Sequence, residues 1–91
     1  MTQNQDNPLL IYEQYVAQNP SPENHLELSL KYYQAGAYMK CIDECLKALS
    51  LKPDYAPAYN NICSAYNALE KWDKAIEACE KALEIDPDFQ L

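Results

Sequence analysis

The chain has 91 residues, so we expect one small domain, and a chain of this size buries too little surface to be more than marginally stable. Its formal charge is −7, from fourteen acidic residues against seven lysines and no arginine, which disfavours nucleic acid because phosphate binding needs a basic surface. A single glycine in an alanine- and leucine-rich sequence favours helix over sheet, and no apolar run approaches the ~20 residues that span a bilayer.

The N-terminal residues 1–7 are polar, and we expect them to be disordered. They contain neither the basic nor the apolar part of a secretion signal, so we expect the protein to be cytoplasmic. An apolar stretch follows, and it predicts a helix from about Pro8 to Gln18 with Asn7 as its N-cap. Residues 8–19 are therefore read as an N-terminal helix, either a half-repeat or a cap.

The rest of the chain repeats with a period of 34 residues. When residues 22–55 are aligned with residues 56–89, nine pairs are identical, where chance gives about two. The pairs include Pro53 with Pro87, Lys40 with Lys74 and Cys45 with Cys79. We therefore divide the chain into a first copy (residues 20–54), a second copy (residues 55–88) and a truncated tail (residues 89–91).

Each copy carries two helical stripes of apolar residues. In the second copy the first stripe runs from Tyr59 to Leu69 and the next from Trp72 to Leu83. In the first copy Ser21 is a suitable N-cap, and Gly36 lies between the stripes, where a left-handed residue ends a helix. A proline closes each copy because it cannot continue the preceding helix. Each copy is predicted to be a helix, a tight turn and an antiparallel helix.

This pattern resembles the tetratricopeptide repeat. The residues that carry the resemblance in the second copy are Tyr59, Ile62, Cys63, Tyr66, Ala75, Cys79, Ala82 and Pro87. Those in the first copy are His25, Leu28, Ser29, Tyr32, Cys41, Cys45, Ala48 and Pro53. The resemblance implies an all-α fold, a right-handed α-solenoid of antiparallel helix–turn–helix repeats, with about two full repeats plus an N-terminal helix. It also implies a scaffold that binds proteins or peptides and is not an enzyme.

The first helix of each pair is expected to line the concave side of the stack, where partners bind. The predicted partner-binding residues lie one step from the packed stripe: Leu26, Glu27, Leu30, Tyr33, Asn60, Asn61, Ser64 and Asn67. Asn61 is the principal candidate, because an amide both donates to and accepts from a peptide backbone. It also matches a groove asparagine common in the family. The alternative is that Asn60 and Asn61 are ordinary solvated helix residues.

No catalytic residue, cofactor site or metal site is predicted. His25 is the single histidine, and it lies on an apolar stripe without a nucleophile near it in sequence. The acidic pair Asp43 and Glu44 resembles a solvated helix face. The four cysteines fall on packing positions where a reduced thiol fits, and a thiolate metal site or a disulfide remain the alternatives.

Other interpretations of the function remain open. Two and a half repeats leave an apolar helix face uncovered, and about three repeats are usual for stability. Such a face favours self-association, as a homo-oligomer or through a swapped helix. The chain is equally compatible with a docking segment of a larger enzyme.

Overall fold

The computed structural model describes residues 7–88, which form five helices and no strand. The helices are α1 (Pro8–Gln18), α2 (Pro22–Gln34), α3 (Tyr38–Leu51), α4 (Ala56–Ala68) and α5 (Trp72–Ile85). The disordered N-terminus was predicted for residues 1–7, of which residues 1–6 lie outside the described part, as does the tail of residues 89–91. Asn7 is described, and it is the ordered N-cap of α1. None of the described helices is long and apolar enough to cross a membrane.

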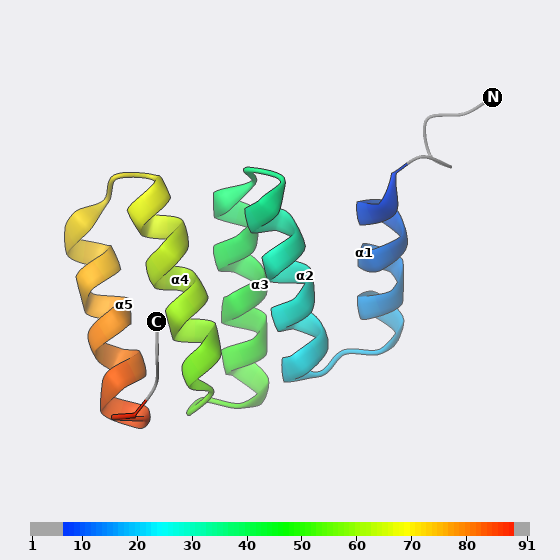
Figure 1. The fold of residues 1–91 in the computed structure, drawn as a ribbon. Helices are drawn as coiled ribbons and strands as arrows, with labels where there is room; N and C mark the ends of the chain where they lie inside the picture. The colour runs from blue at the N-terminus through cyan, green and yellow to red at the C-terminus, as the bar shows by residue number, and fades with distance from the viewer. Residues whose placement is uncertain (1–6, 89–91) are drawn as a thin grey trace.

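Consecutive helices are antiparallel and stand side by side in chain order (Figure 1). Within a repeat α2 packs on α3 and α4 packs on α5, while α3 against α4 joins the two repeats. The helix α1 packs on α2, in the position of a second helix from a preceding repeat. The array is elongated, 48 × 27 × 19 Å. The all-α solenoid with two helix pairs plus an N-terminal helix is confirmed.

The helix starts follow the predicted caps in the first part of the chain. The side chain of Asn7 accepts from the N–H groups of Leu9 and Leu10, and Ser21 Oγ accepts from the N–H of Asn24 at 3.0 Å. Each cap satisfies N–H groups that have no partner within their own helix. The other three helices start without a side-chain cap. These three therefore depend more on packing for their position.

The two turns inside the repeats have the same backbone form. Gly36 has φ +79° and Glu70, 34 residues later, has φ +60°. In the first turn the N–H of Ala37 donates to the carbonyl of Tyr32, and in the second Lys71 donates in the same way to Tyr66. Such a bond across a left-handed residue closes the end of a helix. The left-handed conformation predicted for Gly36 is confirmed, and at Glu70 a residue with a side chain adopts it.

Small side chains fill the tightest helix contacts. The residues with no exposed surface are Ser29, Cys41, Cys45, Ala48, Ala58, Ala65 and Ala82. Small side chains allow helix axes to approach to about 8–10 Å. Larger residues such as Leu28, Ile42 and Ile62 belong to the same buried core. The repeated alanine positions 48 and 82 are buried in both copies, as their place in the repeat predicts.

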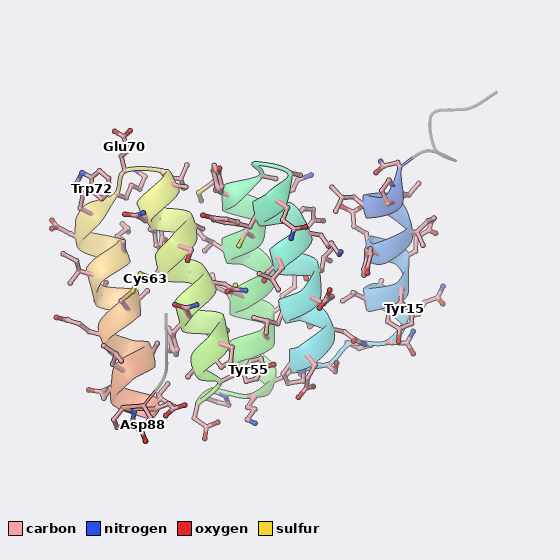
Figure 2. The ribbon with its side chains drawn as sticks, viewed as in Figure 1. Tyr15, Tyr55, Cys63, Glu70, Trp72 and Asp88 are labelled. Carbon is pink, nitrogen blue, oxygen red and sulfur yellow. A yellow bond between two sulfur atoms is a disulfide. The ribbon has the colours of Figure 1, made fainter. Side chains whose placement is uncertain are left out.

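The last helix keeps an uncovered apolar face. In the first repeat Ile42 is covered by α4 and is 3% exposed, whereas its equivalent Ile76 is 56% exposed. Trp72 and Leu83 on the same helix are also exposed, and Figure 2 shows Trp72 at the free side of the array. Among the described residues no helix lies against this side of α5. The uncovered apolar face expected from the number of repeats therefore lies on α5.

Candidate functional site

The predicted partner-binding residues lie on α2 and α4, in four pairs of equivalent positions. The pairs are Leu26 with Asn60, Glu27 with Asn61, Leu30 with Ser64 and Tyr33 with Asn67. The two helices contact each other, so the pairs form one surface, which we call the α2/α4 face. Its exposed members are Glu27, Leu30, Tyr33 and Asn67, and its other four members are half-buried.

Asn61 joins the two repeats. Its amide Nδ2 donates to Ser29 Oγ across 3.1 Å, and that buried hydroxyl donates in turn to the carbonyl of Leu26 across 2.6 Å. One of the two N–H groups of the Asn61 amide is therefore occupied within the protein. Among residues 7–88, no hydrogen bond is made to its Oδ1. The contact with Ser29 fixes the orientation of the amide and leaves its oxygen as an acceptor.

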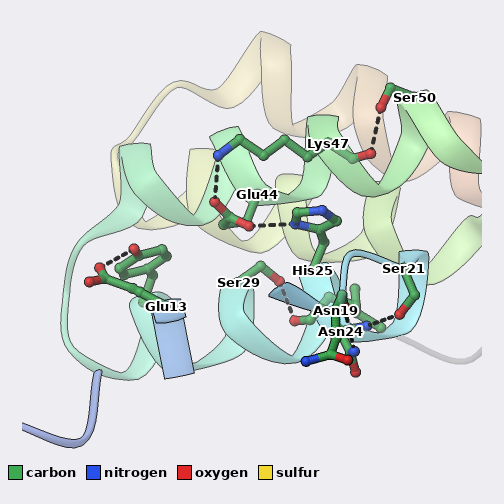
Figure 3. A network of polar contacts seen from close by, with 11 residues as sticks. Glu13, Asn19, Ser21, Asn24, His25, Ser29, Glu44, Lys47 and Ser50 are labelled. Carbon is green, nitrogen blue, oxygen red and sulfur yellow. Dashed lines mark hydrogen bonds and ion pairs between the residues drawn. The ribbon is translucent and has the colours of Figure 1, made fainter. Parts of the chain in front are cut away.

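A buried polar network ties α2 to α3, and the sequence pattern does not predict it. His25 Nδ1 lies 2.7 Å from Glu44 Oε1, and Lys47 Nζ donates to Glu44 Oε2 across 3.0 Å (Figure 3). Glu44 is only 6% exposed. The prediction that Asp43 and Glu44 form a solvated acidic face is therefore wrong for Glu44. A carboxylate tolerates burial when, as here, charged and polar partners satisfy both oxygens.

A signal for this network was present in the repeat itself. Glu44 aligns with Ala78, a buried position in the second copy, so an acid there had to find partners inside the protein. His25 aligns with Tyr59, which occupies the equivalent position in the second repeat. The geometry gives His25 a structural contact between helices rather than an exposed position for proton transfer.

The N-terminal helix is held by a second polar contact. The hydroxyl of Tyr32 donates to a carboxylate oxygen of Glu13 (Figure 3). Burial, followed by this hydrogen bond and the charges of Glu13 and Glu44, raises the pKa of Tyr32 above its ordinary value. The phenol therefore stays protonated and keeps donating throughout the neutral range.

The cysteines divide into two kinds. Cys63 and Cys79 form a disulfide that joins α4 to α5, with Cα atoms 5.3 Å apart (Figure 2). Cys41 and Cys45 are free and buried. The favoured prediction of four reduced packing residues is corrected for the first pair, because the close contact of α4 and α5 brings residues 63 and 79 within bonding range.

The two free thiols differ, because the hydrogen bond with Cys45 lowers the pKa of Cys41, whereas Cys45 is chemically protected. The hydrogen bond with Cys41, together with burial, raises the pKa of Cys45 well above its ordinary value. A protonated, buried thiol is a poor nucleophile and a poor metal ligand. Within residues 7–88 no three metal-binding side chains lie together.

Comparison with known sequences finds a family model that matches the second helix pair. The sequence model described as "Tetratricopeptide repeat" matches residues 56–89, which include all of α4 and α5. The second helix pair is a tetratricopeptide repeat. The family resemblance seen in the sequence is thereby confirmed, and the first helix pair repeats the same architecture.

Solved structures show the same fold over most of the chain. A structure titled "Crystal structure of MamA" has a TM-score of 0.83 and 29% identity, and it matches 89% of this chain and 48% of its own. A second, "Crystal structure of MamA protein", has a TM-score of 0.79 and 27% identity over 91% of this chain and 49% of its own. This chain thus spans about half the length of the MamA chains. No curated protein sequence matches it.

Proposed function

We propose that this tetratricopeptide-repeat chain is a protein-interaction module whose α2/α4 face binds an extended peptide segment of a partner. The family supports the general role, since tetratricopeptide repeats are typically non-catalytic scaffolds that bind proteins or peptides. The role proposed here is accordingly one of binding, without chemistry on the partner.

The observation that carries the proposal is the row of polar groups along α4. Asn60, Ser64 and Asn67 make no side-chain hydrogen bond among the described residues, and Asn61 keeps a free amide oxygen. Each amide offers both a donor and an acceptor, which is what a peptide backbone requires. The row lies beside Leu26, a half-buried apolar residue on the neighbouring helix. The face therefore combines backbone recognition with apolar contact.

Charge defines which partners reach this face most rapidly. The chain carries a net charge of −7, and Glu27 is exposed on the face itself. A negative field accelerates encounter with a basic partner, and the effect weakens as salt screens the charges. The proposed partner is thus a peptide segment of basic or neutral character.

The test compares partners captured from extracts of the source cells by matched variants. Asn60→Ala combined with Asn67→Ala removes two amides without touching the contact between Asn61 and Ser29. We expect capture of the partner to fall roughly tenfold, the effect of losing one or two good hydrogen bonds. Gln18→Ala removes an exposed amide on α1 and should leave capture unchanged. A partner held equally by all three proteins would place binding elsewhere and refute this face.

A second proposal, self-association, is favoured by the uncovered side of α5. Trp72, Ile76 and Leu83 are 55%, 56% and 41% exposed, and contiguous apolar surface of this kind recruits a covering surface. Sedimentation over a range of concentrations should show a dimer or larger species in the wild type. Ile76→Glu should shift the population to monomer. A wild-type chain that stays monomeric at every concentration would rule this proposal out.

A further inference from the structure

Each repeat has a surface hollow beside its second helix, and the two hollows are lined by different side chains. In the second repeat a groove of about 320 Å³ lies between α3 and α5, with α4 as its floor. We call it the α3/α5 groove. The residues that define it are Leu46, Tyr59, Lys74, Glu77, Ala78 and Lys81. None of them belongs to the α2/α4 face.

The same hollow exists in the first repeat, but polar side chains cross it. Its volume is about 210 Å³, and five of its lining residues are the 34-residue equivalents of residues that line the α3/α5 groove. There Glu44 reaches both His25 and Lys47. In the second repeat Ala78 replaces Glu44, and Tyr59 replaces His25. Without the carboxylate no such bridge forms, so the groove opens onto an apolar floor.

The charges of the α3/α5 groove are opposite in sign to those of the chain as a whole. Two lysines and one glutamate line it, in a protein of net charge −7. Lys74 Nζ lies 5.8 Å from the ring centroid of Tyr66 and pairs with no carboxylate among the described residues. Lys81 meets Glu84 only at 3.6 Å, between two exposed side chains. Both lysines are therefore available to a carboxylate from outside the protein.

The spacing of the lysines defines the ligand further. Lys74 and Lys81 are seven residues apart on α5, which is about 10.5 Å along the helix axis. Ala78 and Glu77 lie between them, so the centre of the groove favours an apolar group and the two ends favour negative charge. A peptide in the polyproline II conformation has three residues per turn and advances about 3.1 Å per residue, so carboxylates three residues apart lie on the same side and span nearly this distance. A fatty acid has one carboxylate and satisfies only one end.

We propose that the α3/α5 groove is a second binding site, for a peptide segment of a partner protein in which two acidic residues flank two bulky apolar residues. The apolar pair lies over Ala78 and Leu46, and the flanking carboxylates contact Lys74 and Lys81. This preference is opposite to that of the α2/α4 face. The two sites therefore select different segments.

The probes are three fluorescein-labelled decapeptides that differ only in their four central residues: Glu-Leu-Leu-Glu, Lys-Leu-Leu-Lys and Glu-Ser-Ser-Glu. Fluorescence anisotropy measures binding to the intact chain, and amide NMR shifts locate it. We expect the first peptide to bind with shifts at Leu46 and Ala78, and the other two to bind roughly tenfold more weakly. Equal binding of all three, shifts confined to the α2/α4 face, or no binding of the first at roughly 1 mM would overturn the proposal.

Variants of the protein provide the second arm. Lys74→Gln with Lys81→Gln changes two exposed side chains, and it should weaken the Glu-Leu-Leu-Glu peptide roughly tenfold and reduce its salt dependence. Ala78→Glu introduces the carboxylate of the first repeat and should abolish binding. The matched control is Lys40→Gln, because Lys40 lies 5.7 Å from the Tyr32 ring centroid, as Lys74 does from Tyr66. If the double lysine variant retains wild-type affinity, the site assignment is wrong, whether or not Ala78→Glu folds.

Discussion

At the scale of single residues, equivalent positions of the two repeats have different chemistry. Glu44 and Ala78 both lie on the buried side of the second helix of a repeat. In the first repeat the carboxylate is kept inside by His25 and Lys47. In the second, an alanine beside Tyr59 needs no partner. His25 fits with Glu44, and Tyr59 fits with Ala78. Placing alanine opposite His25 leaves the buried imidazole without its partner.

This consistency predicts a coupling that a double-mutant cycle measures. Glu44→Ala should lower the free energy of unfolding by about 1–3 kcal/mol, because it leaves His25 without its buried acceptor. Adding His25→Tyr, which installs the pair of the second repeat, should recover much of that loss. Urea unfolding followed by circular dichroism gives both values. Strictly additive single effects would show that His25 and Glu44 do not depend on each other.

Local features of the chain could be predicted from the sequence, whereas the pairing of His25 with Glu44 could not. Asn7, Ser21 and Gly36 were predicted correctly because capping and left-handed turns depend on neighbours a few residues away. The pairing of His25 with Glu44 spans 19 residues and two helices. Its geometry depends on how the helices are rotated against each other, which periodicity alone does not give. An acid next to another acid then looks like a solvated surface.

At the scale of elements, the helix pairs differ in how they are held together. Ser29 and Cys45 of the first repeat correspond to Cys63 and Cys79 of the second. In the first repeat the position is covered by Asn61 of the following helix, which bonds to Ser29. In the second it lies beside the uncovered side of α5, and a disulfide joins the two helices. A disulfide therefore joins the two helices at the position that, in the first repeat, is covered by the following helix.

The disulfide should therefore carry a measurable share of the stability. It closes a loop of 16 residues, for which constraint of the unfolded chain contributes about 2–3 kcal/mol. Reductant should lower the urea midpoint of the wild type. The double variant Cys63→Ser with Cys79→Ala should unfold near the urea midpoint of the reduced wild type, and reductant should not change that midpoint. Cys41→Ala, which copies Ala75 of the second repeat, serves as the control that stays sensitive.

Counting reactive thiols tests whether Cys63 and Cys79 are joined by a disulfide in solution. Protein denatured without reductant should show two reactive thiols, from Cys41 and Cys45, and four after reduction. Four thiols without reductant, or identical midpoints in both conditions, would contradict the proposed contribution. The spacing of Cys63 and Cys79 in the sequence does not predict their contact, although both lie on packed positions of the repeat. Packing positions on facing helices are also the positions from which side chains meet.

At the scale of the whole molecule, each helix depends on its immediate neighbours in the array. In such solenoids stability is close to a sum of local terms and contacts between adjacent units. The helix α3 packs against both α2 and α4, whereas α1 packs against α2 and α5 against α4. Val16 is the one buried residue of α1, and α5 buries only three alanines. Both ends of the array are therefore weaker than its middle.

Amide hydrogen exchange should resolve this gradient. We expect α1 to exchange fastest, because it is held by little apolar surface, the bond from Tyr32 to Glu13 and the contact of Lys31 with the Tyr12 ring. We expect α3 and α4 to exchange slowest. The disulfide should keep α5 closer to the middle than its packing alone would. Reduction should then lower the protection of α5 towards that of α1 while leaving α3 little changed. Uniform protection across all five helices in both states would mean that the array opens as one cooperative unit, and the nearest-neighbour description would have to be abandoned.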